Sequence, residues 1–237
     1  MIKSLDLEIL AQPDDHTCGP TCLHAVYRYY DRTLPLEQVI NEAESLEGGG
    51  TLAVMLGHHA LSRGFSARIY TYNMQVFDPT WFGSTPAFLV EKLVAQSKLK
   101  SGKRLQLASR AYLKFLRLGG EIRFEDMRPS LLRKYLKKGV PILTGLSATY
   151  LYRTPREKQT GTRVDYDDLA GEPSGHFVVL AGYDKETRRV QVADPLKENP
   201  MGEGQTYWVD IDRLICAIML GILTYDANLL ILQPPTE

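Results

Sequence analysis

The stretch of the 237-residue sequence with the clearest chemical content surrounds Cys18. Residues 12–22 read Gln-Pro-Asp-Asp-His-Thr-Cys-Gly-Pro-Thr-Cys. Pro20 suits the first turn of a helix, so Cys18 would lie at the N-terminal edge of that helix. The unpaired N–H groups at such an edge favour a thiolate over a thiol. The spacing therefore predicts a nucleophilic cysteine, the kind of side chain that attacks a carbonyl carbon.

Two neighbours of Cys18 fit the same chemistry. Gln12 lies six residues upstream, and a loop that folds back would bring its amide to the same cleft. The Gln12 amide and the Cys18 N–H would then form the pair of donors that an oxyanion hole needs. Gly19 has no side chain, so we expect the backbone of a substrate to approach closely there.

Two other interpretations of Cys18 are open from the sequence. Free cysteine is among the most often buried residue types, so Cys18 could be a small core residue, as we expect for Cys22. A metal site could form from Cys18, Cys22 and either His16 or His24. The sequence offers no second ligand pair at a recognised spacing, so we expect neither a metal nor another cofactor.

A cysteine nucleophile needs a base, and the base needs a partner that holds its tautomer. Of the five histidines, His176 opens an apolar segment of strand character, 176–182, and a second such segment, 189–194, follows a polar turn. A turn centred on Lys185 would place His176 directly opposite Asp194, with Cβ atoms about 5 Å apart. A slip of one residue would put the two side chains on opposite faces.

The segments 12–30 and 175–195 together resemble the papain-like cysteine peptidases. The closest resemblance is to the bacteriocin-processing family that cuts after double-glycine leaders. The first segment carries Cys-Gly-Pro-Thr-Cys, and the second carries His-Phe-Val-Val and Val-Ala-Asp-Pro. The resemblance covers about 40 residues, and nothing in the chain resembles the transporter domains to which many such peptidases are fused.

The resemblance implies a role for each of four side chains. Cys18 would be the nucleophile, His176 the base, Asp194 the residue that orients the base, and Gln12 the oxyanion donor. It also implies a papain-like α+β fold, in which a helical lobe that carries the cysteine packs on an antiparallel sheet that carries the histidine and the aspartate. The implied function is a thiol-dependent peptidase or amide hydrolase that forms an acyl-enzyme with a peptide or protein substrate.

Two alternative functions use the same fold. In the first, a peptide amine rather than water resolves the thioester, which makes the protein a transpeptidase or another amide-bond-forming enzyme. In the second, the protein is a papain-like binding module without catalysis. Product analysis with an added amine, and the rate at which Cys18 reacts with iodoacetamide, distinguish these functions from a hydrolase.

The elements that must position these residues follow from the apolar pattern. Helices are expected at 18–30, 35–46, 52–62, 85–99, 105–118, 130–138 and from 210, and strands at 65–72, 140–146, 176–182, 189–194, near 207 and at 228–232. Helices precede most of the strands, which is typical of α+β proteins. We expect one domain over 1–237, with a helical basic insertion at about 84–120. The long polar loop at 148–174 comes directly before His176, where it could form a lid over the cleft.

The composition excludes several classes of protein. Hydrophobic residues make up 44% and charged residues 24%, which excludes a disordered or low-complexity chain. Lys plus Arg equals Asp plus Glu at 28 each, so a globally basic nucleic-acid binder is not expected. Three cysteines and the lack of a signal-like or membrane-spanning apolar run predict a cytoplasmic protein.

The charge is unevenly distributed along the chain. Residues 92–120 contain eight basic and no acidic side chains. A stretch of this kind either faces solvent or docks an acidic partner. No pattern of aromatic residues suited to stacking on nucleic-acid bases accompanies it, so we do not expect it to bind nucleic acid.

Overall fold

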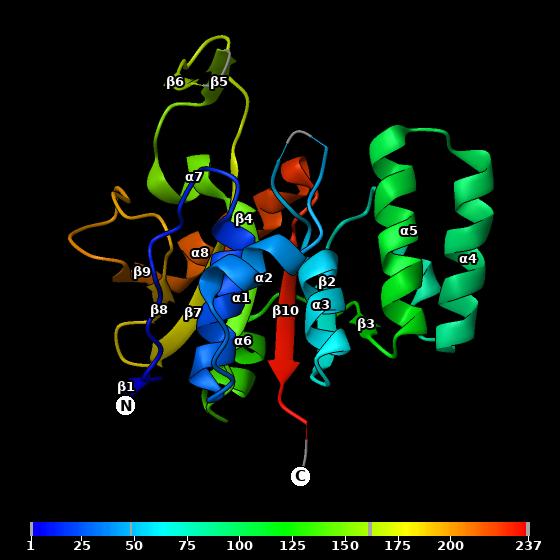
Figure 1. The fold of residues 1–237 in the computed structure, drawn as a ribbon, viewed down its shortest axis with the longest axis horizontal. Coiled ribbons are helices and arrows are strands. Elements are labelled where there is room, and N and C mark those ends of the chain that lie inside the picture. The colour runs from blue at the N-terminus through cyan, green and yellow to red at the C-terminus, as the bar shows by residue number, and fades with distance from the viewer. Residues whose placement is uncertain (1, 48, 161–162, 236–237) are drawn as a thin grey trace.

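The computed structural model describes residues 2–47, 49–160 and 163–235 of the chain. Its main sheet runs in the order β3-β2-β10-β4-β7-β8-β9, with β1 added beside β7 (Figure 1). The strands are β1 (Ile2–Ser4), β2 (Ser66–Thr71), β3 (Glu121–Arg123), β4 (Ile142–Ser147), β7 (Gly175–Asp184), β8 (Arg189–Ala193), β9 (Thr206–Asp210) and β10 (Asn228–Gln233). Within the described residues only the β2–β3 pair is parallel, so the sheet is mostly antiparallel, as the α+β class predicts.

Helices cover both faces of this sheet. They are α1 (Cys18–Tyr29), α2 (Leu36–Glu42), α3 (Ala53–Ser62), α4 (Pro86–Leu99), α5 (Lys103–Arg117), α6 (Pro129–Leu136), α7 (Ala148–Tyr152) and α8 (Ile211–Leu220), with short 3₁₀ turns at Pro79–Trp81 and Gly221–Thr224. Helices α1 and α3 lie on one face. On the other face α6 packs against β4 and β7, and α8 packs against β4, β8 and β9 (Figure 1). Within the described residues no helix is long and apolar enough to cross a membrane.

Helix α1 is held against the sheet by an apolar stripe. Leu23, Val26 and Tyr27 are at most 1% exposed, and their spacing of three and four residues puts them on one side of the helix. This side packs against β7. The start of α1, and with it Cys18, is thereby fixed beside the strand that carries His176.

The C-terminal strand β10 occupies the middle of the sheet, between β2 and β4. Leu229, Leu230, Ile231 and Leu232 are at most 2% exposed, because both faces of this strand are covered. The chain therefore inserts its last strand between two earlier ones. This arrangement joins the part of the sheet that carries β2 and β3 to the part that carries the candidate site.

The expectation that 148–174 is an irregular loop is wrong. The segment begins with α7, where the hydroxyl of Ser147 accepts a hydrogen bond from the N–H of Tyr150. It continues as a hairpin of β5 (Glu157–Thr160) and β6 (Arg163–Tyr166), and residues 161–162 between them lie outside the described part. Figure 1 shows this hairpin projecting from the rest of the molecule. The sequence does not predict these elements, because α7 is too short and the hairpin too polar to show an apolar periodicity.

Three further differences concern the ends and edges of elements. The second helix was expected to reach residue 46 but ends at Glu42, after which Ala43 adopts an extended backbone. Strands β1 and β3, each of three residues, were not expected. Strand β3 forms the edge of the sheet beside β2. Strand β1 pairs with residues 182–184 of β7, beyond the part of β7 that pairs with β4. Strands this short leave too few residues for an alternating pattern in the sequence.

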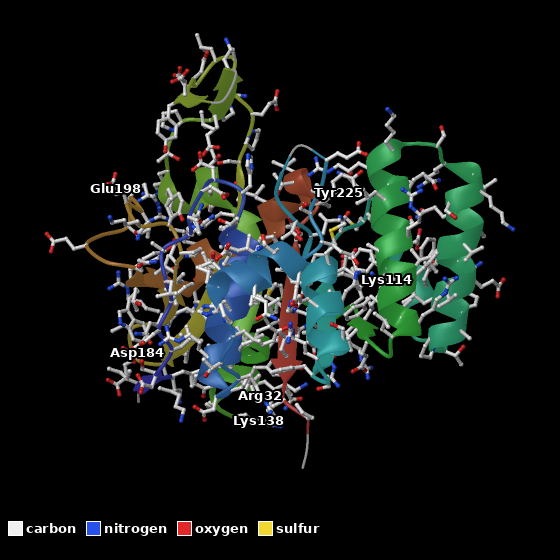
Figure 2. All side chains as sticks on the ribbon, viewed as in Figure 1. Arg32, Lys114, Lys138, Asp184, Glu198 and Tyr225 are labelled. Carbon is white, nitrogen blue, oxygen red and sulfur yellow. The ribbon has the colours of Figure 1, made fainter. Side chains whose placement is uncertain are left out.

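Helices α4 and α5 form an antiparallel hairpin at one edge of the molecule, as the two helices expected at 85–99 and 105–118 predict (Figure 1). Two basic residues of α5 attach it to the rest of the chain. Lys114 forms an ion pair with Glu44, and the Arg104 guanidinium donates to the carbonyl of Thr224 at 2.9 Å and lies 4.6 Å from the ring centre of Tyr225 (Figure 2). Part of the basic stretch is therefore structural.

The β7–β8 register differs from the expected one. Asp184 pairs with Arg189, so the turn is centred beyond Lys185, and a bulge at Ala181 then shifts the pairing by one residue. On the far side of the bulge, Val192 pairs with Leu180. The expected direct pairing of His176 with Asp194 is therefore wrong, although the two side chains still meet.

Candidate active site

Cys18 is the first residue of α1 and is half-buried. The sequence-based position at a helix N-terminus is thus confirmed. One turn later, Cys22 is fully buried and its thiol lies 3.2 Å from the carbonyl oxygen of Phe177. Burial, followed by the charges of Cys18 and Asp194, raises the pKa of the Cys22 thiol well above its ordinary value. Cys22 is therefore a core residue, as predicted.

Gly19 does not serve the purpose expected from the sequence. It is buried, and a Cβ atom added to it would lie 2.5 Å from Cγ2 of Thr51 and 3.2 Å from side-chain atoms of Leu56 and Phe177. The missing side chain thus allows α1 to pack closely against the core. It does not open space for a substrate backbone, because core side chains already fill that space.

His176 and Asp194 form the central contact of the site. Nε2 of His176 lies 2.8 Å from Oδ1 of Asp194, and both residues are buried, Asp194 completely. Cys18 lies near the same ring, because it is among the groups that raise the pKa of His176. Since Nε2 faces Asp194, Nδ1 is the ring nitrogen left to face the thiol. The structure thus brings together three of the four residues singled out in the sequence.

The Asp194 carboxylate is held by more partners than the sequence suggested. Its Oδ2 accepts hydrogen bonds from the hydroxyls of Tyr152 and Tyr207, each at 2.7 Å. Its Oδ1 accepts the backbone N–H of Leu196 at 2.9 Å in addition to His176. Neither tyrosine was singled out, since Tyr152 falls in the supposed loop and Tyr207 in a short strand. Their hydroxyls remove the cost of burying this charge.

The electrostatics of the pair favour charge on both partners. Burial lowers the pKa of His176, but the charge of Asp194, its hydrogen bond and the contact with Cys18 outweigh burial and raise that pKa to about 10. Burial raises the pKa of Asp194, but the His176 charge and the hydrogen bonds from His176, Tyr152 and Tyr207 hold it below its ordinary value. At neutral pH the site therefore contains an imidazolium beside a carboxylate.

Gln12 lies next to the site through its backbone. Its N–H donates to the carbonyl of Pro195 at 2.9 Å, which ties residue 12 to the residue after Asp194. The side-chain amide nitrogen donates to the carbonyl of Asp14 at 2.8 Å, and the amide oxygen is buried without a partner. The amide nitrogen carries a second N–H that this bond does not use. The loop between Gln12 and Cys18 does fold back as expected.

The residues considered for a metal site do not converge. Nε2 of His24 lies 3.0 Å from the carbonyl oxygen of Leu34. The ring of His16 lies against Gly49, as a Cβ atom built on this glycine would lie 2.5 Å from Nδ1 of His16. In the described ranges, no group of three or more His, Cys, Asp or Glu side chains could hold a metal ion.

The sequence of residues 109–214 matches the profile of the Peptidase_C39 like family. This part of the chain resembles C39-like peptidases. The matched segment includes His176 and Asp194 but not Cys18, which lies before its first residue. The match therefore supports the resemblance for the base and its partner and says nothing of the nucleophile. A comparison with curated proteins gives no match.

Among solved structures, three similar chains are peptidases by their descriptions. A double glycine motif protease from an AMS/PCAT transporter, in complex with the leader peptide, is 15% identical, with 98% of this chain and 94% of that chain covered and a TM-score of 0.48. A putative C39-like peptidase from Bacillus anthracis is 14% identical, with both chains covered completely and a TM-score of 0.46. Xylellain, a cysteine protease from Xylella fastidiosa, is 14% identical, with coverages of 99% and 86% and a TM-score of 0.44.

Proposed function

We propose that the protein is a cysteine peptidase or amide hydrolase with Cys18, His176 and Asp194 as its catalytic groups. The observation that carries this proposal is the hydrogen bond between the His176 imidazole and the buried Asp194 carboxylate, with Cys18 next to the ring at the start of α1. A nucleophile, a base and a residue that orients the base are the three parts that acyl transfer requires. The C39-like match of residues 109–214 supports the same reaction class.

The proposed reaction begins at the Cys18 sulfur. The Cys18 thiolate, with the His176 imidazolium beside it, attacks the carbonyl carbon of a peptide bond. The carbonyl oxygen takes up the negative charge, and the Cys18 N–H at the start of α1 and the free N–H of the Gln12 amide would donate to it. As the C–N bond breaks, His176 gives its proton to the leaving amine, and Cys18 is left as a thioester.

The second half of the reaction restores the enzyme. The now neutral His176 takes a proton from water, the hydroxide oxygen bonds to the thioester carbon, and the C–S bond breaks. A carboxylic acid leaves, the sulfur departs as the thiolate, and His176 is an imidazolium again. Throughout the cycle Asp194 keeps the ring in one orientation, and Tyr152 and Tyr207 keep Asp194 in place.

Two measurements test this function. A library of internally quenched peptides measures hydrolysis, and iodoacetamide labelling followed by mass spectrometry locates the reactive cysteine. Cys18→Ala should abolish cleavage and labelling at that position, whereas Cys216→Ala, which replaces an exposed cysteine, should leave both unchanged. Labelling of Cys18 at pH 7 no faster than that of free cysteine, or cleavage that survives Cys18→Ala, would refute the proposal.

The acceptor is tested on the same reaction mixture. Hydroxylamine cleaves thioesters, so a peptide hydroxamate should form when it is added during turnover. A free carboxylate as the product in buffer alone identifies a hydrolase. An amide product that forms when a peptide amine is added identifies the transpeptidase alternative.

A further inference from the structure

A cavity of about 460 Å³ lies beside α7 and is referred to here as the α7 pocket. Its walls come from the end of β4, from α7, from the residues before β7 and from the turn after α8. The lining residues are Ser147, Thr149, Tyr150, Arg153, Arg156, Pro173, Leu220 and Leu223. None of them belongs to the catalytic line described above, so the pocket has no function in the proposed chemistry itself.

The α7 pocket is adjacent to the catalytic residues along the chain and across the sheet. Tyr152, which bonds to Asp194, is followed directly by the pocket residue Arg153. The pocket residue Ser147 pairs with Gly175, the neighbour of His176. The pocket therefore lies at the end of the sheet where β7 begins, which is also the end that carries His176.

One wall of the pocket is apolar and open to solvent. Tyr150, Leu220 and Leu223 are 42%, 37% and 54% exposed. Exposed large apolar side chains that gather around a concavity, rather than being scattered, are typical of a binding site. An aliphatic or aromatic side chain of a ligand would be buried against this wall.

The pocket also carries positive charge. Arg153 and Arg156 are its charged residues, and no acidic residue lines it. Arg156 donates to the carbonyl oxygens of Asp168 and Leu169, and its charge is among the causes that lower the pKa of the Asp167 carboxyl. Arg153 is therefore the positive charge that the pocket offers to a ligand. Burial and the nearby charge of Arg153 lower the pKa of Arg213, so positive charge accumulates here.

The backbone of Arg153 is strained. It caps α7 in the left-handed conformation, with φ 58° and ψ 39°, a position that glycine usually occupies. A residue with a side chain pays about 1–2 kcal/mol for this conformation. An arginine is thus kept where glycine would be more stable, and this arginine lines the pocket. Strain retained next to a catalytic site suggests that the side chain is used.

We infer that the α7 pocket is a specificity subsite that binds an acidic residue of the peptide substrate together with a neighbouring apolar side chain. The inference rests on the proposed function and adds the substrate class to it. The carboxylate pairs with Arg153, and Arg156 strengthens the field. The apolar side chain covers Tyr150, Leu220 and Leu223. A fork-shaped guanidinium matches a carboxylate in geometry as well as in charge.

The test begins with the sites that the wild-type protein cuts in a diverse peptide library, read by mass spectrometry. We expect Asp or Glu to be enriched within a few residues of the cut bond, next to an aliphatic or aromatic residue. The best peptide is then compared with its own Glu→Gln version. The wild type should cleave the acidic peptide with a kcat/KM at least tenfold higher.

Two variants connect this preference to Arg153. Arg153→Gly removes the charge and also the left-handed strain, so it should fold at least as stably as the wild type and lose the tenfold ratio. Arg153→Glu should reverse the preference, toward the Glu→Lys version of the peptide. Arg117→Glu is the matched control, because Arg117 is exposed at the end of α5, far from α7 in the fold (Figure 1), and it should leave the ratio unchanged.

Each outcome decides between the two proposals. Cleavage without acidic enrichment, or an Arg153→Gly protein that keeps the wild-type ratio, would overturn the subsite and leave the peptidase function intact. Absence of cleavage of every peptide by the wild type would overturn the peptidase function and the subsite with it. Loss of the ratio in Arg153→Gly alone, with Arg117→Glu unchanged, supports both.

Discussion

Asp194 reaches His176 along a diagonal of the β7–β8 hairpin. The last regular pair joins Val179 to Ala193, and this register places Asp194 level with Val178, two residues from His176. Side chains two residues apart share a face, and diagonal neighbours remain within reach of each other. The bulge at Ala181 is essential to this geometry. Without its one-residue shift, Asp194 would lie on the opposite face from His176.

The Asp194 charge should set the protonation state of His176. In the wild type the Asp194 charge outweighs burial and raises the pKa of His176 to about 10. In Asp194→Asn the imidazolium loses this counter-charge, and burial should then lower the pKa of His176 below its ordinary value. At pH 8 the ring becomes neutral. We expect kcat/KM at this pH to fall by about 10²-fold or more, within the range of general acid–base catalysis. An NMR titration of the histidine ring protons measures the pKa directly.

The matched control for this variant is Asp212→Asn. Asp212 is an exposed carboxylate that pairs with Arg188 on the surface, so its removal should change neither the titration nor kcat/KM. A His176 pKa that stays near 10 in Asp194→Asn would show that another charge sets it. The dependence of stability on pH gives a second reading. A raised histidine pKa contributes stability that is complete below about pH 6.5 and is lost as the pH rises through 10, so the variant should lack this loss.

The catalytic line could be predicted from sequence because its residues combine reactive chemistry with local context. Cys18 precedes a glycine and a proline, and His176 and Asp194 lie at the ends of two short strands. The expected register was wrong, yet the contact was right. The turn lies further along the chain than expected, which displaces the pairing by three residues, and the bulge reduces this to two. A bulge of one residue cannot be recognised from the sequence of a continuous apolar segment such as 177–181.

Other parts of the site depend on contacts between distant segments. Tyr152 and Tyr207 meet at Asp194 although 55 positions separate them, and a tyrosine in a sequence more often signals core packing. The insertion of β10 between β2 and β4 is equally invisible, since strand order is set by long-range pairing. The fold class, in contrast, follows from the order of helices and strands along the chain.

The two tyrosines should contribute to stability as well as to the site. Tyr207→Phe removes a hydrogen bond to a fully buried carboxylate, which costs about 1.5–3 kcal/mol of unfolding free energy. The pKa of Asp194 should rise, because one of the bonds that lower it is lost. Tyr152→Phe should act in the same way, and the double variant should lose more than the sum, since the carboxylate oxygen Oδ2 is then left without a donor.

Tyr30→Phe is the control for both tyrosine variants. Its hydroxyl donates to the neutral carbonyl of Leu232 at 3.1 Å and is remote from the site. We expect a smaller loss, about 0.5–1.5 kcal/mol, with kcat/KM unchanged. Urea unfolding measures the free energies. Equal losses in Tyr30→Phe and Tyr207→Phe would argue against a special role for the bonds to Asp194.

Gly19 should be intolerant of even a methyl group. In Gly19→Ala the new Cβ atom would lie 2.5 Å from Cγ2 of Thr51, too close for any side chain, so α1 must move. Overpacking of this kind costs about 1–3 kcal/mol, and the movement displaces the adjacent Cys18 from His176. We expect lower stability and slower iodoacetamide labelling of Cys18.

A second substitution separates this clash from other effects of the alanine. Thr51→Ser removes Cγ2 but keeps the hydroxyl that donates to the carbonyl of Glu44 at 2.7 Å. In the Gly19→Ala background it should restore part of the stability and of the labelling rate. Contacts at 3.2 Å with Leu56 and Phe177 remain, so the rescue should be incomplete. A double variant no more stable than Gly19→Ala alone would place the strain elsewhere.

Asp226 should make the protein less stable as the pH rises toward neutrality. It is buried, its Oδ1 accepts the N–H of Ala53 at the start of α3 at 3.4 Å, and burial raises its pKa to about 7. Between about pH 4 and 7 the folded state then holds more protons than the unfolded state, so the free energy of unfolding falls with pH and levels off above 7. A shift of about three pH units corresponds to at most about 4 kcal/mol.

Asp226→Asn removes this titration while retaining an oxygen that accepts the Ala53 N–H. The variant should gain stability relative to the wild type as the pH is raised from 4.5, and the difference between the two proteins should grow steadily up to about pH 7 and level off above it. Urea unfolding at several pH values measures it, with Asp212→Asn as the exposed control. A wild-type-minus-variant difference that is constant over this range would mean that Asp226 is charged throughout, held by the N-terminus of α3 and the charge of Arg104.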